Sequence, residues 1–190
     1  MTFRVQSAAV VRYALRHVIY LFRFSLWLLS ELEAHLSEPG DPLILRKAYL
    51  RSNGIKPPVK LWIGRNFILH KGYGTVQINE QCALGDNVTI ACHSSITIGK
   101  GFIGASGLHI DSGSHDPTTL RPFNKPILIG DNVWCGIQTT ILAGSQIGDH
   151  CIIAAGGVVK SIIPDYTIAA GVPAIPKKKL VRVSENLWAW

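Results

Sequence analysis

The chain has 190 residues, of which 47% are hydrophobic and 16% charged, and its formal net charge is +7. This composition is typical of one globular domain with an appendage, and it excludes a disordered chain. The mean hydropathy of +0.24 requires a large buried apolar surface. The positive charge is concentrated before residue 30 and between residues 160 and 182, which suggests two anionic contacts. No nucleic-acid-binding motif accompanies either group, so no nucleic acid partner is expected.

Residues 6–36 predict a helix that ends before the breaker-rich sequence SEPGDP. At helical pitch Arg12, Arg16 and Arg23 fall within about 40° of one another, and most of the remaining surface is aliphatic or aromatic. These charges interrupt the apolar run, so a transmembrane span is not expected. Two uses of the apolar face stay open. The helix docks on the folded core or another subunit, or it lies on an anionic membrane.

The cysteines indicate the cellular compartment. Cys82, Cys92, Cys135 and Cys151 form no CxxC pair and no zinc-ligand spacing, which favours free, buried thiols in a reducing cytoplasm. No small-x-small cleavage site follows the early apolar stretch, so no secretory signal is predicted. We therefore expect a cytoplasmic protein, with peripheral contact at the inner face of the membrane through residues 6–30 as the open question.

A six-residue period runs through the second half of the chain. Steps of six give an unbroken apolar row: Ile129, Cys135, Ile141, Ile147, Ile153 and Val159. Two residues before each of the last five lies a small or β-branched residue: Val133, Thr139, Ser145, Cys151 and Gly157. The row also appears upstream at Ile78, Leu84, Ile90 and Ile96, then slips by two and resumes at Ile98, Gly104 and Ile110. Such a period predicts short parallel strands joined by tight turns, which is a parallel β-helix.

Residues 111–126 interrupt this period with a polar, proline-containing segment that carries His115 near its start. A solenoid tolerates such an excursion because neighbouring coils carry the stability. Long excursions from a repeat are often functional, and a neutral surface insertion is the alternative.

The sequence resembles the hexapeptide-repeat acyltransferases. Within them it is most similar to the galactoside/maltose O-acetyltransferase and exopolysaccharide acetyltransferase branch. The stretches that carry the resemblance are SITIGKGFIG, GSHD, PILIGDNVWCG and ILAGSQIGDHCIIAAGGVVKSIIPDYTIAAGVPA. They cover about residues 61–178. The resemblance implies a mainly β fold, a left-handed parallel β-helix with an N-terminal α-helical segment and one extruded loop.

The expected organisation has three parts. Residues 1–55 form an N-terminal helical segment and connector, and residues 56–176 form the β-helix acyltransferase domain with its extruded loop at 111–126. Residues 177–190 form a basic, tryptophan-bearing tail.

The resemblance also implies an acetyl-CoA-dependent homotrimer with active sites between neighbouring subunits. The histidine of the family's motif corresponds to His115, which would act as the base. The positions that correspond to the acetyl-CoA site are Ile137, Ala155, Gly156, Lys160 and Lys178. One departure is that Lys160-Ser161 stand where the family usually has Thr-Lys.

The chemistry of these residue types agrees with acyl transfer. Attack of a hydroxyl on a thioester requires a base near neutrality, which imidazole provides. No GxSxG or Cys–His nucleophile signature is visible, so direct transfer is expected. A backbone N–H near Ile137 is a candidate donor to the oxyanion. Asp111 and Asp116 flank His115 and either orient its imidazole or cap a turn.

Three residues are candidates for binding the acceptor: Trp134, His93 and Asp111. Trp134 either stacks on a sugar ring or packs at the trimer interface. His93 aligns with a sugar-contacting carboxylate of the galactoside enzymes, which indicates a different acceptor. The spacing of His93, His109 and His115 differs from that of residues that bind one metal ion together, so no metal is expected.

The predicted function is acetyl-CoA-dependent O-acetylation of a sugar hydroxyl in the synthesis of a surface polysaccharide such as lipopolysaccharide, capsule or exopolysaccharide. An amino-sugar N-acetyltransferase is the nearest alternative. A γ-carbonic-anhydrase-like metal hydratase and a non-catalytic trimeric scaffold at a membrane surface are alternatives of different classes.

Overall fold

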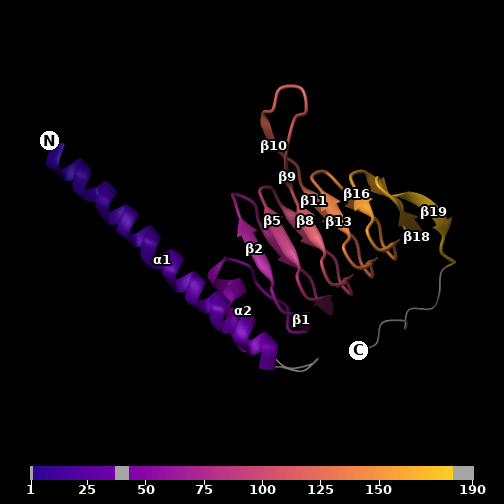
Figure 1. Ribbon diagram of the computed structural model, residues 1–190, viewed down its shortest axis with the longest axis horizontal. Coiled ribbons are helices and arrows are strands. Elements are labelled where there is room, and N and C mark those ends of the chain that lie inside the picture. The colour runs from indigo at the N-terminus through magenta and orange to yellow at the C-terminus, as the bar shows by residue number, and fades with distance from the viewer. Residues whose placement is uncertain (1, 37–42, 182–190) are drawn as a thin grey trace.

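A computed structural model of the chain describes residues 2–36 and 43–181, with side chains described from residue 12 onward. The chain begins with helices α1 (Thr2–Leu36) and α2 (Ile44–Ser52) and continues as a stack of short strands (Figure 1). The helix expected at 6–36 is therefore present, and α2 lies in the segment that was expected only to connect. Trp188 and Trp190 lie outside the described residues.

The strands form three parallel sheets that the chain visits in turn, which we call faces A, B and C. Face A contains β1 (Leu61–Ile63), β4 (Cys82–Leu84), β7 (Ile103–Gly104), β12 (Trp134–Cys135), β15 (Ile152–Ile153) and β18 (Thr167–Ala170). Face B contains β2 (Ile68–Lys71), β5 (Thr89–Cys92), β8 (His109–Asp111), β13 (Thr140–Leu142) and β16 (Val158–Val159). Face C contains β3 (Val76–Ile78), β6 (Ile96–Ile98), β11 (Ile127–Ile129), β14 (Gln146–Ile147) and β17 (Ile162–Ile163). The predicted parallel β-helix is confirmed.

The start of the basic segment expected at residues 177–190 belongs to a strand. Residues Ile175–Lys179 form β19, which pairs antiparallel with β18 at the end of face A. The lysine run is thus held on an edge strand, and Lys178 lies opposite Ile168.

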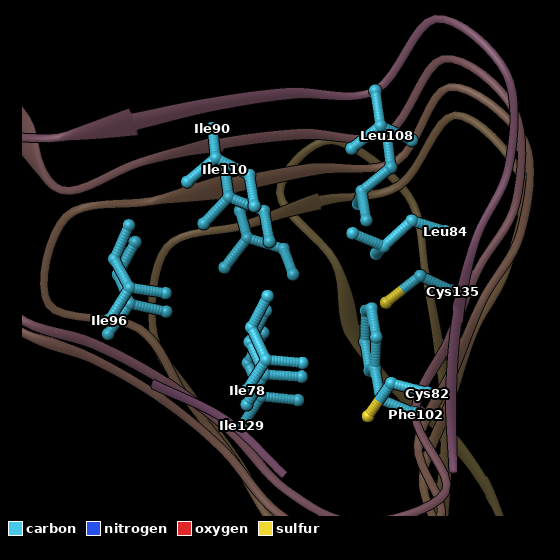
Figure 2. Close-up of a cluster of buried hydrophobic side chains, with 14 of the residues drawn as sticks. Ile78, Cys82, Leu84, Ile90, Ile96, Phe102, Leu108, Ile110, Ile129 and Cys135 are labelled. Atoms are coloured by element: carbon cyan, nitrogen blue, oxygen red, sulfur yellow. The ribbon is translucent and has the colours of Figure 1, made fainter. Parts of the chain in front are cut away.

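Inside the coil, each face contributes one column of stacked side chains. The register aligns Ile78, Ile98, Ile129, Ile147 and Ile163 on face C, and Leu69, Ile90, Ile110, Ile141 and Val159 on face B. All ten are buried, and Figure 2 shows Ile90 over Ile110 and Ile78 over Ile129. Each such aliphatic side chain contributes about 1.5–3 kcal/mol when buried. The whole six-residue row of the sequence lies in this core.

The two-residue slip in the row has a structural cause. From Ile141 to Ile147 the chain crosses from face B to face C in six residues, but from Ile90 to Ile98 it takes eight. In the next coil the crossing contains residues 112–126, whose strands β9 (Gly113–His115) and β10 (Pro122–Asn124) form an antiparallel hairpin. This hairpin projects beyond the coils (Figure 1). The extra residues therefore gather at one edge, which we call the B–C edge.

All four cysteines are free and buried, as expected. Burial raises the pKa of each thiol, to about 11 for Cys82. These side chains fill the core and are not poised for thiolate chemistry.

The C-terminal part of α1, together with α2, closes the open end of the β-helix. A short corner joins the face A strand to the face B strand of each coil. From the second coil onward, the third residue of this corner donates its N–H to a carbonyl oxygen of the coil before it, as Asn87 does to Arg65. All of these bonds are 2.9 Å or shorter. The first coil has no coil before it. There the Glu31 carboxylate accepts the N–H of Asn66 and of Phe67. Glu31 thus supplies the acceptors that a preceding coil would provide.

A buried ion pair holds Glu31 in place. Arg46 of α2 is fully buried, pairs with Glu31 and donates to the carbonyl oxygen of Gly64 at 2.9 Å. Nearby, the Trp27 indole N–H donates to the carbonyl oxygen of Phe67 at 3.0 Å. The docking of the expected helix on the folded core is therefore found at this end of α1.

We predict that Glu31→Ala lowers the free energy of unfolding by about 3–5 kcal/mol, because it leaves the Arg46 charge buried without its partner. Urea unfolding followed by circular dichroism measures this. Asp86→Ala is the matched control, since it removes an exposed ion pair with Arg65 and is expected to cost less than Glu31→Ala. Equal losses in the two variants would contradict the role given to Glu31.

Candidate active site

The hairpin at the B–C edge is fixed at its base by Ser112. This serine is fully buried, and its Oγ accepts the N–H groups of His93 at 2.9 Å and Ser94 at 2.8 Å. At the other end of the hairpin, the N–H of Lys125 donates to the carbonyl oxygen of Ser112 at 3.0 Å. Both ends of the hairpin are therefore tied to the preceding coil through Ser112, a residue that no motif in the sequence marks.

The imidazole of His93 occupies a slot between two glycines. A Cβ placed on Gly113 would lie 2.6 Å from its Cδ2, and one on Gly72 would lie 3.1 Å from its Nδ1. The ring fits because both neighbouring residues are glycines, and a Cβ at either position would crowd it. His93 therefore packs against the first residue of β9, two residues before His115.

His115 ends β9, opposite Pro122 in the hairpin, and is exposed. The carboxylates beside it are engaged by backbone. Asp111 Oδ1 accepts the N–H of Gly113 at 2.8 Å, and Asp116 Oδ1 accepts the N–H groups of Thr118 and Thr119. The hydrogen bonds from Thr119 and Thr118 hold the pKa of Asp116 below its usual range. Of the two expected uses of these carboxylates, the capping of turns is the one observed.

Ile137 lies at a different edge, in the corner between faces A and B that we call the A–B edge. In the first such corner the second residue, Arg65, donates its N–H to Asp86 Oδ1 of the next coil at 2.8 Å. Ile137 is the equivalent residue two coils above Asp86, and the residue over it is Ala155, which has no side-chain oxygen. Among the described residues nothing accepts the N–H of Ile137, although its neighbours Gly136 and Gln138 both donate to adjacent coils.

The surroundings of that N–H are accessible. Ile137 is 56% exposed, and Ala155 and Gly156 are exposed in the next coil. Gly156 has a φ of +67°, and no atom lies within 4 Å of a Cβ placed there. A backbone donor with this open approach suits an oxygen anion or the carbonyl of an extended ligand.

The structure distributes the candidate residues over three places. His93, Asp111, His115 and Lys160 lie along the B–C edge; Ile137, Ala155 and Gly156 lie along the A–B edge; Trp134 and Lys178 lie on face A. Face B separates the two edges, and face A lies opposite the B–C edge. One chain therefore does not place His115 beside Trp134 or Ile137.

Trp134 points outward from β12 and is 40% exposed, between Ile103 and Ile152 of the neighbouring strands. Its ring is thus part of an apolar row on face A. Within the described part of the chain, no group of three or more His, Cys, Asp or Glu side chains is arranged to hold a metal ion.

Comparisons with known proteins agree with this geometry. The family model described as bacterial transferase hexapeptide (six repeats) matches residues 126–161, which cover β11 to β16 and the open N–H of Ile137. Residues 126–161 are thus similar to the hexapeptide-repeat transferases.

Proteins similar to this chain carry acetyltransferase names. WbbJ of Escherichia coli strain K12, named for O-acetyl transfer in lipopolysaccharide biosynthesis, is 32% identical over 122 residues, which cover 57% of this chain and 62% of that protein. The chain thus spans less than two thirds of the length of this curated relative.

Two solved structures share the fold. The hexapeptide-repeat acetyltransferase VCA0836 of Vibrio cholerae, complexed with acetyl coenzyme A, has a TM-score of 0.70 and 27% identity, covering 83% of this chain and 87% of that one. A galactoside acetyltransferase in complex with coenzyme A has a TM-score of 0.70 and 25% identity, covering 86% and 82%. The predicted left-handed β-helix is confirmed by these matches.

We predict that Ser112→Ala lowers the free energy of unfolding by about 1–3 kcal/mol, because the N–H groups of His93 and Ser94 lose their acceptor. Urea unfolding at one fixed protein concentration measures the loss, and hydrogen exchange at these two amides locates it. Ser114→Ala, in the exposed part of the same hairpin, is the control and is expected to change little. Unchanged exchange at both amides in Ser112→Ala would contradict the prediction.

Proposed function

We propose that this chain is an acetyl-CoA-dependent O-acetyltransferase that acts on a carbohydrate hydroxyl. The observation that carries the proposal is the outward N–H of Ile137, which has no acceptor among the described residues and stands beside the open backbone of Gly156. The acetyl-CoA and coenzyme A in the two related structures support a donor of this class. The name of WbbJ supports an acceptor in the synthesis of a surface polysaccharide.

His115 acts as the base in this proposal. A ring nitrogen of the neutral imidazole takes the proton of the acceptor hydroxyl as its oxygen attacks the thioester carbonyl carbon. The N–H of Ile137 donates to the oxyanion that forms. Collapse breaks the C–S bond and forms the acetyl ester, and the imidazolium returns its proton to the leaving thiolate. The hairpin anchored by Ser112 holds the imidazole at a fixed distance from the coil.

The donor and acceptor are bound by the remaining candidates. Ala155 and Gly156 line the pantetheine arm through their backbone, and Lys160 and Lys178 bind the phosphates. Trp134, His93 and Asp111 face the acceptor. His93 is the residue best placed to contact it from the B–C edge, since its ring packs at the base of the hairpin.

The assembly proposed here is a homotrimer. In one chain face B separates His115 from Ile137, so a complete site requires the B–C edge of one copy and the A–B edge of the next. A closed ring of copies supplies such a pair at every interface. The apolar row around Trp134 on face A provides surface for the contact.

The proposed location is cytoplasmic, with peripheral contact at the inner face of the membrane through residues 6–30. No helix among the described residues is long and apolar enough to span a bilayer.

We predict that His115→Ala reduces acetyl transfer by about 10²–10⁴-fold without loss of folding, because the hydroxyl loses its base. Release of free coenzyme A thiol in the presence of sugar acceptors measures turnover. His35→Ala, at the end of α1, is the control and keeps the parent rate. Turnover of His115→Ala at the parent rate would refute the role of this histidine.

We predict that two inactive variants restore activity when they assemble together. Ala155→Asp places a carboxylate where Asp86 stands over Arg65, so it occupies the N–H of Ile137 and blocks the donor. If sites form between copies, every trimer that contains both His115→Ala and Ala155→Asp chains regains one intact site of its three, or about a third of the parent activity. Coexpression of differently tagged chains, tandem purification and thiol release test this. Activity no higher than that of either variant alone would show that each site lies within one chain.

A further inference from the structure

The outer side of α1 is apolar and has no partner within the described part of the chain. The exposed apolar side chains on this side are Leu15, Val18, Leu21, Phe22, Leu28, Leu29 and Leu32. At about 100° per residue they occupy an arc of roughly 140°. Trp27, Ser30 and Glu31, which contact the β-helix, lie on the opposite side. The helix is therefore held by one side and presents the other to its surroundings.

The charge on α1 has a single sign. Residues 2–30 contain no Asp or Glu, and Arg12, Arg16 and Arg23 lie on the side away from the exposed apolar arc. Tyr13 and Tyr20, 66% and 68% exposed, flank the arginines on one side. An apolar arc opposed by a cationic stripe, with tyrosines at the boundary, is the pattern of helices that lie in a membrane surface.

We propose that the outer side of α1 lies in the surface of a membrane that contains anionic phospholipids, with the arginines at the headgroup phosphates. This proposal rests on the peripheral location given above and names its lipid chemistry and its residues. The apolar arc enters the boundary between headgroups and acyl chains. Phosphates supply the negative charge that α1 itself lacks before Glu31.

Charge complementarity favours lipid over a second copy of the helix as the occupant. Another α1 would bring further arginines and, over residues 2–30, no acidic side chain to pair with them. A helix also needs only a narrow apolar stripe to pack against a copy of itself, and the arc here is wider than such a seam.

The attachment of α1 fixes how the β-helix would stand on the membrane. Glu31 joins the helix to the backbone of the first coil at Asn66 and Phe67, and Arg46 joins it to Gly64. In Figure 1 the free part of α1 extends well away from the coils. Binding of α1 therefore brings the first coil, with α2, to the membrane side of the molecule.

Flotation of the full chain with vesicles tests the proposal. The probes are vesicles of phosphatidylcholine alone and of phosphatidylcholine mixed with phosphatidylglycerol. The protein is expected to float with the mixed vesicles, less with the neutral ones, and less as salt is raised. Arg16→Gln with Arg23→Gln is expected to weaken binding to the mixed vesicles about 25-fold, at roughly fivefold per arginine.

The apolar arc is tested with Leu21→Gln and Phe22→Gln together, which are expected to abolish flotation. Both side chains are about 60% exposed, so the fold does not depend on them. Val59→Gln with Ile162→Gln removes exposed apolar side chains elsewhere and is the matched control, which is expected to float like the parent.

The outcomes separate this proposal from the proposed function. No flotation of the parent with either vesicle overturns it, as does equal binding to neutral and anionic vesicles. A change of oligomeric state in Leu21→Gln/Phe22→Gln without vesicles assigns the arc to a second copy and also overturns it. Acetyl transfer to soluble acceptors is measured on the same proteins: activity without flotation refutes only the lipid contact, and flotation without activity refutes only the enzyme.

Discussion

The structure depends on the hydrogen bonds that each coil makes with the coil before it. At each corner between faces A and B, the third residue donates its N–H to the second residue of the preceding corner, from Asn87 through to Gly156. These bonds keep the coils in register and stack the side chains of the core into columns. Extra residues can then leave only at an edge, because an insertion within a strand would turn every following side chain to the wrong side. The hairpin with His115 follows this rule.

The same register explains both the open donor and the closed end of the coil. Outward corner N–H groups are capped wherever the next coil offers an aspartate, as Asp86 does for Arg65. Ala155 offers none, so Ile137 keeps an available donor on a rigid backbone. At the first coil the missing neighbour is replaced by Glu31, which a buried arginine holds in position. An available backbone donor and a structural cap therefore arise from the same backbone geometry, which is left open at Ile137 and satisfied at the first coil.

The three faces also decide how a site can be assembled. A single chain separates the hairpin of His115 from the corner of Ile137 by the width of face B. Chemistry that needs both groups then requires a second copy, and the apolar row around Trp134 offers a surface for it. The helix α1 adds a different surface at the first coil, where the apolar side chains point away from the β-helix. The surface proposed for assembly and the surface proposed for membrane contact thus lie on separate parts of the molecule.

Patterns within the sequence are enough to predict the β-helix, the buried row from Ile129 to Val159, the excursion around His115 and the apolar character of α1. These follow from local periodicity, since each coil repeats the same contacts with its neighbour. The three-dimensional contacts were needed to find the roles of Ser112, Gly72 and Gly113, the cap formed by Glu31 and Arg46, and the strand formed by the lysines of β19. Ser112, Gly72 and Gly113 contact residues of neighbouring coils across the B–C edge, where the number of residues varies from coil to coil. The cap and β19 lie outside the repeat, so no periodic spacing in the sequence marks their partners.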